Sequence, residues 1–163
     1  MNGKLRNMTA IYLFNRDQVL LLFRQGGKVV NNVWTGSAGG HFEDHELNNA
    51  TACVLREVHE ELGLCETDME NFSLRYVALR RTNGEIRQNY YFFANLKESA
   101  ANDLRSTEGT LKWFPFKEIG KLDMPYTAKH VMAHYYATGQ FTDLLYTGVA
   151  DKNGVTFLEL PEF

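Results

Sequence analysis

Four apolar residues at every fourth position are the feature that most restricts how this chain can fold. They are Ala50, Val54, Val58 and Leu62. On an α-helix, residues four apart lie on the same face. Gly63 follows at the place where a glycine commonly ends a helix. The pattern predicts an amphipathic helix from Leu47 to Leu62, whose apolar face must pack against another element.

Short β-prone runs flank this helix on both sides. The expected strands are Thr9–Phe14, Val19–Phe23, Phe72–Arg81, Glu85–Leu96, Leu111–Phe116 and Phe157–Leu160. Turn-forming residues join the first two into a hairpin, Asn83-Gly84 joins the next two, and Asp151–Gly154 forms the turn of a last hairpin. A second helix is expected over Pro125–Thr138, and the glycine-rich stretch Gln25–Gly40 predicts a loop. This mixture indicates an α/β fold in which helices cover both faces of a sheet.

Composition narrows the class of protein. The chain has 163 residues, of which 44% are hydrophobic and 23% charged, as in one soluble domain that spans residues 1–163. A net charge of -3 argues against a nucleic-acid polymer as partner. No apolar run approaches the roughly 20 residues of a membrane span, and the N-terminus lacks the pattern of a secretory signal. We therefore expect a cytoplasmic protein that acts on small molecules, with Cys53 and Cys65 as buried thiols.

Three glutamates of the predicted helix point to metal chemistry. Glu57, Glu60 and Glu61 are three and four residues apart, so they share one face. Like charges at this spacing destabilise a helix by about 0.2 to 0.5 kcal/mol per pair, and a bound divalent cation would reverse that cost. Carboxylates are the oxygen ligands that Mg²⁺ prefers. The glutamates alone are consistent with either a magnesium site or a solvated acidic surface.

The residues around these glutamates resemble the Nudix box. Its pattern is Gly, five residues, Glu, seven residues, then Arg-Glu-apolar-any-Glu-Glu-any-Gly-apolar. Gly40 and Glu46 have five residues between them, and Arg56 to Leu64 match every specified position. Nine residues rather than seven separate Glu46 from Arg56. The two extra residues fit most easily in a turn near Leu47–Asn49, which leaves the role of Glu46 open.

The resemblance is to Nudix hydrolases of the MutT-like type, and it implies an α/β/α sandwich with a mixed sheet. It also implies that Glu57, Glu60, Glu61 and the carbonyl of Gly39 bind Mg²⁺, or alternatively Mn²⁺. The implied catalytic residues are Arg56, Glu57, Glu60, Glu61 and Glu108. Among them, Glu57 and Glu108 are candidates for the general base.

The same resemblance suggests how the substrate binds. The expected substrate-binding residues are Trp34, Gly39, Gly40 and Tyr90. The two aromatic residues offer stacking surface, although aromatic residues on strands are more often part of the core.

The nature of the substrate is less constrained than the chemistry. The layout is similar to hydrolases that convert oxidised purine nucleoside triphosphates, such as 8-oxo-dGTP, to a monophosphate and pyrophosphate. Two segments depart from the mammalian type of these enzymes: Trp34–Gly36 lacks its asparagine, and Met124–Thr127 lacks its aspartate pair. A nucleotide sugar, a dinucleotide or an isoprenoid diphosphate remains an alternative substrate. A non-catalytic nucleotide-binding Nudix domain and a homodimer also remain open.

Overall fold

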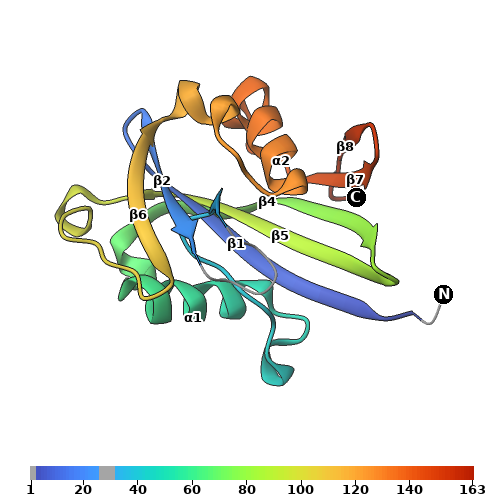
Figure 1. Cartoon of the computed structure of the whole chain (residues 1–163), viewed down its shortest axis with the longest axis horizontal. Coiled ribbons are helices and arrows are strands. Elements are labelled where there is room, and N and C mark those ends of the chain that lie inside the picture. The colour runs from blue at the N-terminus through green and yellow to red at the C-terminus, as the bar shows by residue number, and fades with distance from the viewer. Residues whose placement is uncertain (1–2, 26–31) are drawn as a thin grey trace.

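The computed structural model describes residues 3–25 and 32–163, which form one sheet and two long helices (Figure 1). The strands are β1 (Leu5–Asn15), β2 (Gln18–Arg24), β3 (Val33–Thr35), β4 (Met69–Thr82), β5 (Glu85–Leu96), β6 (Gly109–Pro115), β7 (Tyr146–Asp151) and β8 (Gly154–Glu159). The α-helices are α1 (Ala50–Leu62) and α2 (Tyr126–Ala137). Short 3₁₀ helices span Asp44–Glu46, Glu66–Asp68, Glu98–Ala100, Phe116–Lys121 and Gly139–Phe141. The three expected hairpins and both expected helices are thus confirmed.

The sheet of the described residues is mixed. Its order is β3-β2-β1-β5-β4-β7-β8, and β6 pairs with β2 outside this path. β1 runs parallel to β5 and β4 runs parallel to β7, whereas the other pairs are antiparallel.

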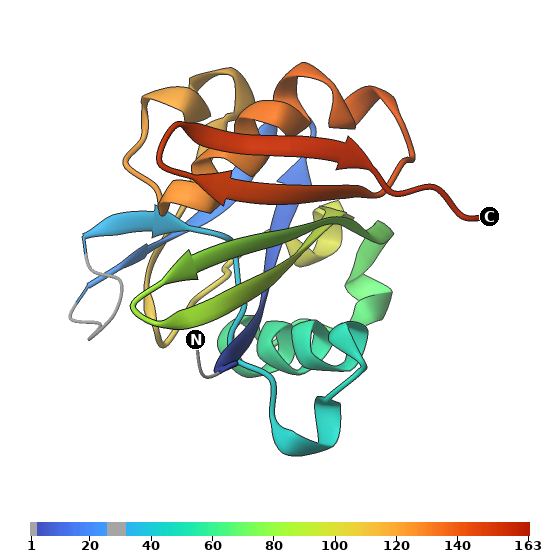
Figure 2. The ribbon, with the colours of Figure 1, turned by 90° about the vertical axis from the view of Figure 1, so that its right-hand side faces the viewer.

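The two long helices cover opposite faces of this sheet. Side chains alternate along a strand, so Ile11 and Leu13 of β1 pack in the core with α1, whereas Tyr12 and Phe14 pack in the core with α2. Figure 1 shows the helices on either side of the strands, and Figure 2 shows the β7–β8 hairpin beside α2. The expected α/β/α sandwich with a mixed sheet is confirmed.

Divergence of β1 and β2 makes room for the glycine pair. The two strands pair only over Leu13–Asn15 of β1. Nearer the start of β1, the segment Ala38–His41 takes the neighbouring place through two isolated bridges. Gly39 and Gly40 therefore lie beside β1, on the path between the sheet and α1.

Three sequence-based expectations need correction. Val33–Thr35 is a strand inside the stretch expected to be a loop, because it pairs with the end of β2 and the Trp34 ring packs on aromatic neighbours; residues 26–31 of that stretch lie outside the described residues. The helix begins at Ala50 rather than Leu47, because the Asn49 side chain accepts a hydrogen bond from the Ala52 amide and caps it. Cys65 is exposed rather than buried.

No helix in residues 3–25 and 32–163 is both long and apolar enough to cross a membrane.

Candidate active site

The glycine pair is required by close approach to its neighbours. A Cβ on Gly39 would collide with the backbone of β1, and its φ of +146° is one that other residues rarely adopt. A Cβ on Gly40 would collide with the carboxylate of Glu57. The amide of Gly39 also donates a hydrogen bond to Glu61 Oε2 at 3.1 Å. The pair therefore lets this loop pack directly against the acidic face of α1.

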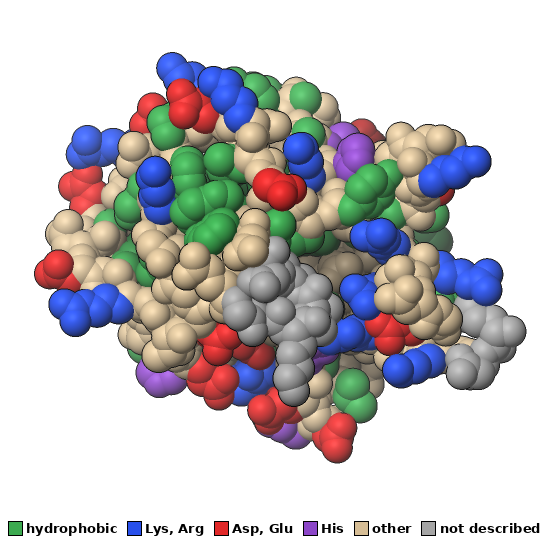
Figure 3. All heavy atoms as spheres, in the orientation of Figure 1, with side chains coloured by type: hydrophobic (Ala, Val, Ile, Leu, Met, Phe, Trp, Pro, Cys, Tyr) green, Lys and Arg blue, Asp and Glu red, His purple; other side chains and the backbone are tan. Residues whose placement is uncertain are grey.

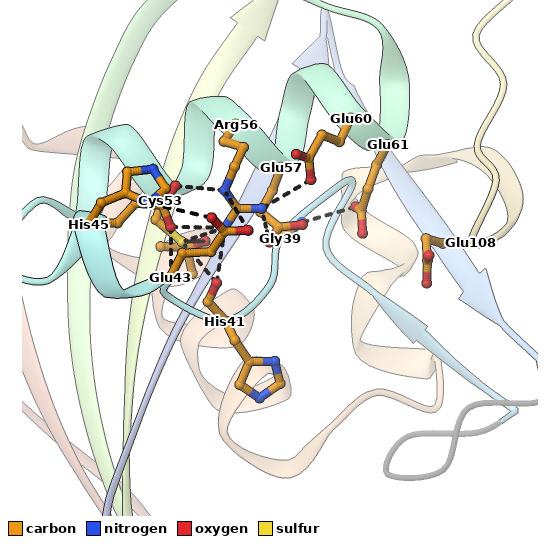
Figure 4. A network of polar contacts seen from close by, with 12 residues as sticks. Gly39, His41, Glu43, His45, Cys53, Arg56, Glu57, Glu60, Glu61 and Glu108 are labelled. Atoms are coloured by element: carbon orange, nitrogen blue, oxygen red, sulfur yellow. Dashed lines mark hydrogen bonds and ion pairs between the residues drawn. The ribbon is translucent and has the colours of Figure 1, made fainter.

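Arg56 is the centre of the polar network on that face. Its Nε and Nη2 donate to the two carboxylate oxygens of Glu46 at 2.6 and 2.9 Å. Its Nη1 donates to Glu57 at 2.8 Å and to Glu60, one helical turn further on, at 3.0 Å. Nη2 also reaches the carbonyl of His41 at 3.0 Å. Figure 4 shows the arginine among these carboxylates.

Glu46 forms this bidentate pair despite the longer spacing of the box. Its side chain is 1% exposed, and the hydrogen bonds from Arg56 lower its pKa to about 2. A second bond, from the Glu43 amide to Glu46 Oε2 at 2.9 Å, closes the 3₁₀ turn that carries it. Leu47–Asn49 form a turn between this 3₁₀ helix and α1, in which Asn48 adopts a φ of 74°. Glu46, whose role the sequence did not decide, therefore holds Arg56 in place.

Hydrogen bonds only partly offset the effect of burial on the pKa values of Glu57 and Glu61. Burial raises the pKa of Glu57 despite its bond to Arg56. Burial likewise raises the pKa of Glu61 to about 7, against the opposing effect of the Gly39 amide. A nearby cation would stabilise both ionised forms.

Glu108 lies opposite Glu61. The Nη2 of Arg24 is 3.0 Å from Glu108 and 3.7 Å from Glu61, so one guanidinium links the two acids. Figure 4 shows both carboxylates on the side of the network away from His45. The structure brings this later acid to the box, although half of its side chain is exposed. Sequence reasoning missed Arg24, because nothing in its spacing links a residue at the end of β2 to the box.

The acidic face of α1 carries oxygen ligands of the kind that bind divalent cations, but these side chains do not converge on a common point. In the described parts of the chain, no three His, Cys, Asp or Glu side chains are gathered so that they could hold a metal ion. The reason is visible in the contacts, since Glu57 and Glu60 both turn to Arg56 while Glu61 turns to Gly39. The donors are nevertheless hard oxygens, and burial raises the pKa values of the buried Glu61 and the half-buried Glu57. This donor set is suited to Mg²⁺ or Mn²⁺.

A cavity of about 150 Å³ opens beside Gly39 and Glu61 on the α2 side of the sheet. Its lining includes the polar, basic and aromatic side chains of Tyr12, Arg24, Arg80, Arg87, Asn89 and Tyr91. The two aromatic residues expected to bind substrate are not among those that line it. Trp34 packs on Phe23 and Phe114, and Tyr90 packs on Phe42. Tyr90 is on the α1 side of β5, so its neighbour Tyr91 faces the cavity instead.

Solved structures share this architecture. A MutT protein from Bacillus halodurans is 24% identical, with a TM-score of 0.66 over 96% of this chain and 99% of that chain. A MutT protein from Methanosarcina mazei is 14% identical, with a TM-score of 0.69 over 86% of this chain and 99% of that chain. An Ap4A hydrolase from C. elegans is 16% identical, with a TM-score of 0.64 over 85% of this chain and 99% of that chain. These likenesses establish the fold.

A protein-family model also matches most of the chain. The model of the NUDIX domain matches residues 4–137, a segment that contains the glycine pair, α1 and Glu108. None of the curated proteins compared with the chain matches it. The match covers most of the sequence and includes the residues that form the acidic network. The chain therefore belongs to the Nudix family of pyrophosphohydrolases, which act on phosphorus-containing acid anhydrides.

Proposed function

We propose that this protein is a magnesium-dependent hydrolase that cleaves the pyrophosphate linkage of a nucleoside diphosphate derivative. The observation that carries the proposal is the acidic face of α1, which Arg56 orders beside the glycine pair and which meets a cavity at Glu61. Nudix hydrolases generally use divalent metals and act on small-molecule nucleotides, and every glutamate of the box is present here. A non-catalytic binding domain is the less favoured alternative, because it would not need every glutamate of the box.

In this proposal Glu57, Glu60, Glu61 and the Gly39 carbonyl hold Mg²⁺, with Mn²⁺ as a substitute. A bound metal supplies charge neutralisation at the phosphates and lowers the pKa of a water ligand. The protein contributes the positions of its carboxylates, since Arg56 fixes two of them and Gly40 leaves room for one.

The general base is proposed to be Glu57 or Glu108. Glu57 lies against Gly40 within the box, whereas Glu108 approaches from the other side through Arg24. A base that removes a proton from the attacking water contributes about 10² to 10⁴ in rate. Separate Glu57→Gln and Glu108→Gln variants, compared by kcat, identify the one with the larger loss.

An oxidised purine triphosphate such as 8-oxo-dGTP is one substrate to test, with cleavage to the monophosphate and pyrophosphate. The likeness to an Ap4A hydrolase supports adding Ap4A, and nucleotide sugars and isoprenoid diphosphates complete the set. A cytoplasmic location and a homodimer stay predictions.

The test is release of phosphate-containing products across these compounds, with Mg²⁺, with EDTA and in a Glu60→Gln variant. Glu70→Gln is the matched control, because Glu70 is exposed on β4. We expect release that needs Mg²⁺, collapses in Glu60→Gln and survives in Glu70→Gln. Binding of a nonhydrolysable triphosphate by calorimetry, without release from any compound, would instead support the non-catalytic domain.

A further inference from the structure

One tyrosine hydroxyl at the cavity has no hydrogen-bond partner among the residues that the structure describes. Tyr12 is completely buried, lines the cavity, and its hydroxyl oxygen is the one buried side-chain polar atom in residues 3–25 and 32–163 without a hydrogen bond. A buried polar group without a partner costs folding free energy, so such groups are rare and call for an explanation. Burial also raises the pKa of this phenol, which keeps it protonated and able to donate.

Arg80 lines the same cavity and has no acidic partner among the described residues. Its guanidinium carbon lies 5.0 Å from the centroid of the Tyr126 ring, which also lines the cavity. Within the described residues, no carboxylate forms an ion pair with Arg80, unlike Arg24 and Arg87. A guanidinium stacked on a ring keeps its edge donors available for a planar or tetrahedral anion.

The charges of the cavity lining are unbalanced. Glu61 is the one carboxylate among the described lining residues, and it lies at the end that meets the box. Near the starts of β1 and β5, Glu85 forms ion pairs with Lys4, Arg6 and Arg87, and Arg87 also lines the cavity. Figure 3 shows basic side chains around an acidic one on the side of the molecule where Figure 1 has the β4–β5 turn and the start of β1. The other charged residues of the described lining are Arg24, Arg80 and Arg87, so the lining carries more positive than negative charge.

We propose that the Arg80 guanidinium and the Tyr12 hydroxyl bind an anionic group of the substrate, a phosphomonoester or a carboxylate, that lies beyond the reacting diphosphate. The inference rests on the proposed function and narrows its substrate class. The Arg80 guanidinium can only donate, and the phenolic hydroxyl of Tyr12 can donate as well as accept, so an anionic acceptor would satisfy the donors of both groups. A neutral purine edge would also present N–H donors, for which Glu61 is the one carboxylate in the described lining, and Glu61 is hydrogen-bonded to Gly39.

The first test measures anion binding without metal or turnover. The thermal unfolding midpoint is recorded in inorganic phosphate and in chloride of equal ionic strength, which controls for screening. For the wild type we expect a saturable rise of about 3 to 6 °C at ten times the dissociation constant. The rise should vanish in Arg80→Gln and shrink in Tyr12→Phe. It should persist in Arg81→Gln, a control because Arg81 is the next residue on β4 and is exposed.

Tyr12→Phe also separates recognition from a structural role. Because no described residue forms a hydrogen bond with this hydroxyl, its removal should leave the midpoint in chloride unchanged or higher. If Arg80→Gln does not fold, Arg80→Lys replaces it, since lysine keeps the charge but loses the bidentate geometry. An equal rise with phosphate in the wild type and in the Arg80 variant, or no rise in the wild type, would overturn the proposal. A rise that Tyr12→Phe leaves intact would remove Tyr12 from it.

The second test distinguishes the two anions by matched substrates. NADPH and NADH differ by one phosphomonoester, and UDP-glucuronate and UDP-glucose differ by one carboxylate. We expect the anionic member of one pair to have at least a tenfold higher kcat/KM through a lower KM, and Arg80→Gln to abolish that preference. Magnesium-dependent hydrolysis of 8-oxo-dGTP, Ap4A or any pair member without such a preference would leave the proposed function standing and contradict the anion site. Absence of hydrolysis from every compound, together with an intact phosphate effect, would contradict the proposed function alone.

Discussion

Gly40 lies so close to Glu57 that its hydrogen side chain decides where that carboxylate can be. A Cβ at this position would meet only the end of the Glu57 side chain among its nearest neighbours, which can turn away at small cost. We therefore expect Gly40→Ala to fold with a similar unfolding midpoint but to lower kcat by about 10- to 100-fold, because a misplacement of about 1 Å can cost that much. Gly120→Ala is the control, since its Cβ would meet nothing within 4 Å. A Gly40→Ala enzyme with wild-type kcat would contradict the role given to this contact.

Glu46 gives a second prediction for a single residue, on stability and its pH dependence. Its pKa is lowered from 4.5 to about 2 in the folded state, so its contribution is complete above about pH 4.5 and is lost as the pH falls towards 2. We expect Glu46→Gln to reduce the free energy of unfolding at pH 7 by about 2 to 3 kcal/mol. At pH 3 the difference from the wild type should be less than half of that. Denaturant titrations at both pH values measure it, with Glu70→Gln as control, and a difference independent of pH would refute the linkage.

The capped start of α1 gives a prediction for an element. The Asn49 side chain accepts from the Ala52 amide at 3.0 Å, after a turn whose length departs from the usual box. Loss of such a cap costs about 1 kcal/mol, so Asn49→Ala should lower the unfolding free energy by that amount. Exposed Asn102, replaced by alanine, is the control. If both variants are equally stable, the cap does not define where the helix begins.

The elements also show how much the sequence could predict. α1 was predictable because a four-residue apolar repeat reports directly on a buried face. β3 was not, because three residues are too few to show a period and Trp34 finds its partners only after β2 and β6 have paired.

The same distinction applies to the candidate site. The residues of the box lie on one helix and one loop, so their spacing in the sequence was enough to predict that they lie close together. Arg24 and Tyr12 come from β2 and β1, and no local pattern connects them to a cavity that exists only when the sheet is formed. Tyr90 was expected at the substrate although it faces the α1 side, because strand alternation cannot be assigned to a face before the sheet order is known.

At the scale of the whole molecule, we propose that the fold brings the carboxylates of α1 and its glycine loop together, and that these carboxylates converge when a metal ion binds. Most of the sheet serves to hold these two segments against each other, since β1 carries the loop on its edge and packs α1 on its face. The cavity on the opposite face then meets these carboxylates at Glu61. Metal binding should therefore require the box glutamates even when no substrate is present.

The most direct test is a titration with Mn²⁺, followed by the electron paramagnetic resonance signal of the free ion. Mn²⁺ prefers the same oxygen ligands as Mg²⁺. We predict saturable binding to the wild type and to Glu70→Gln, and at least about tenfold weaker binding to Glu60→Gln. Equal Mn²⁺ affinity in the wild type and Glu60→Gln would show that these carboxylates do not form the metal site.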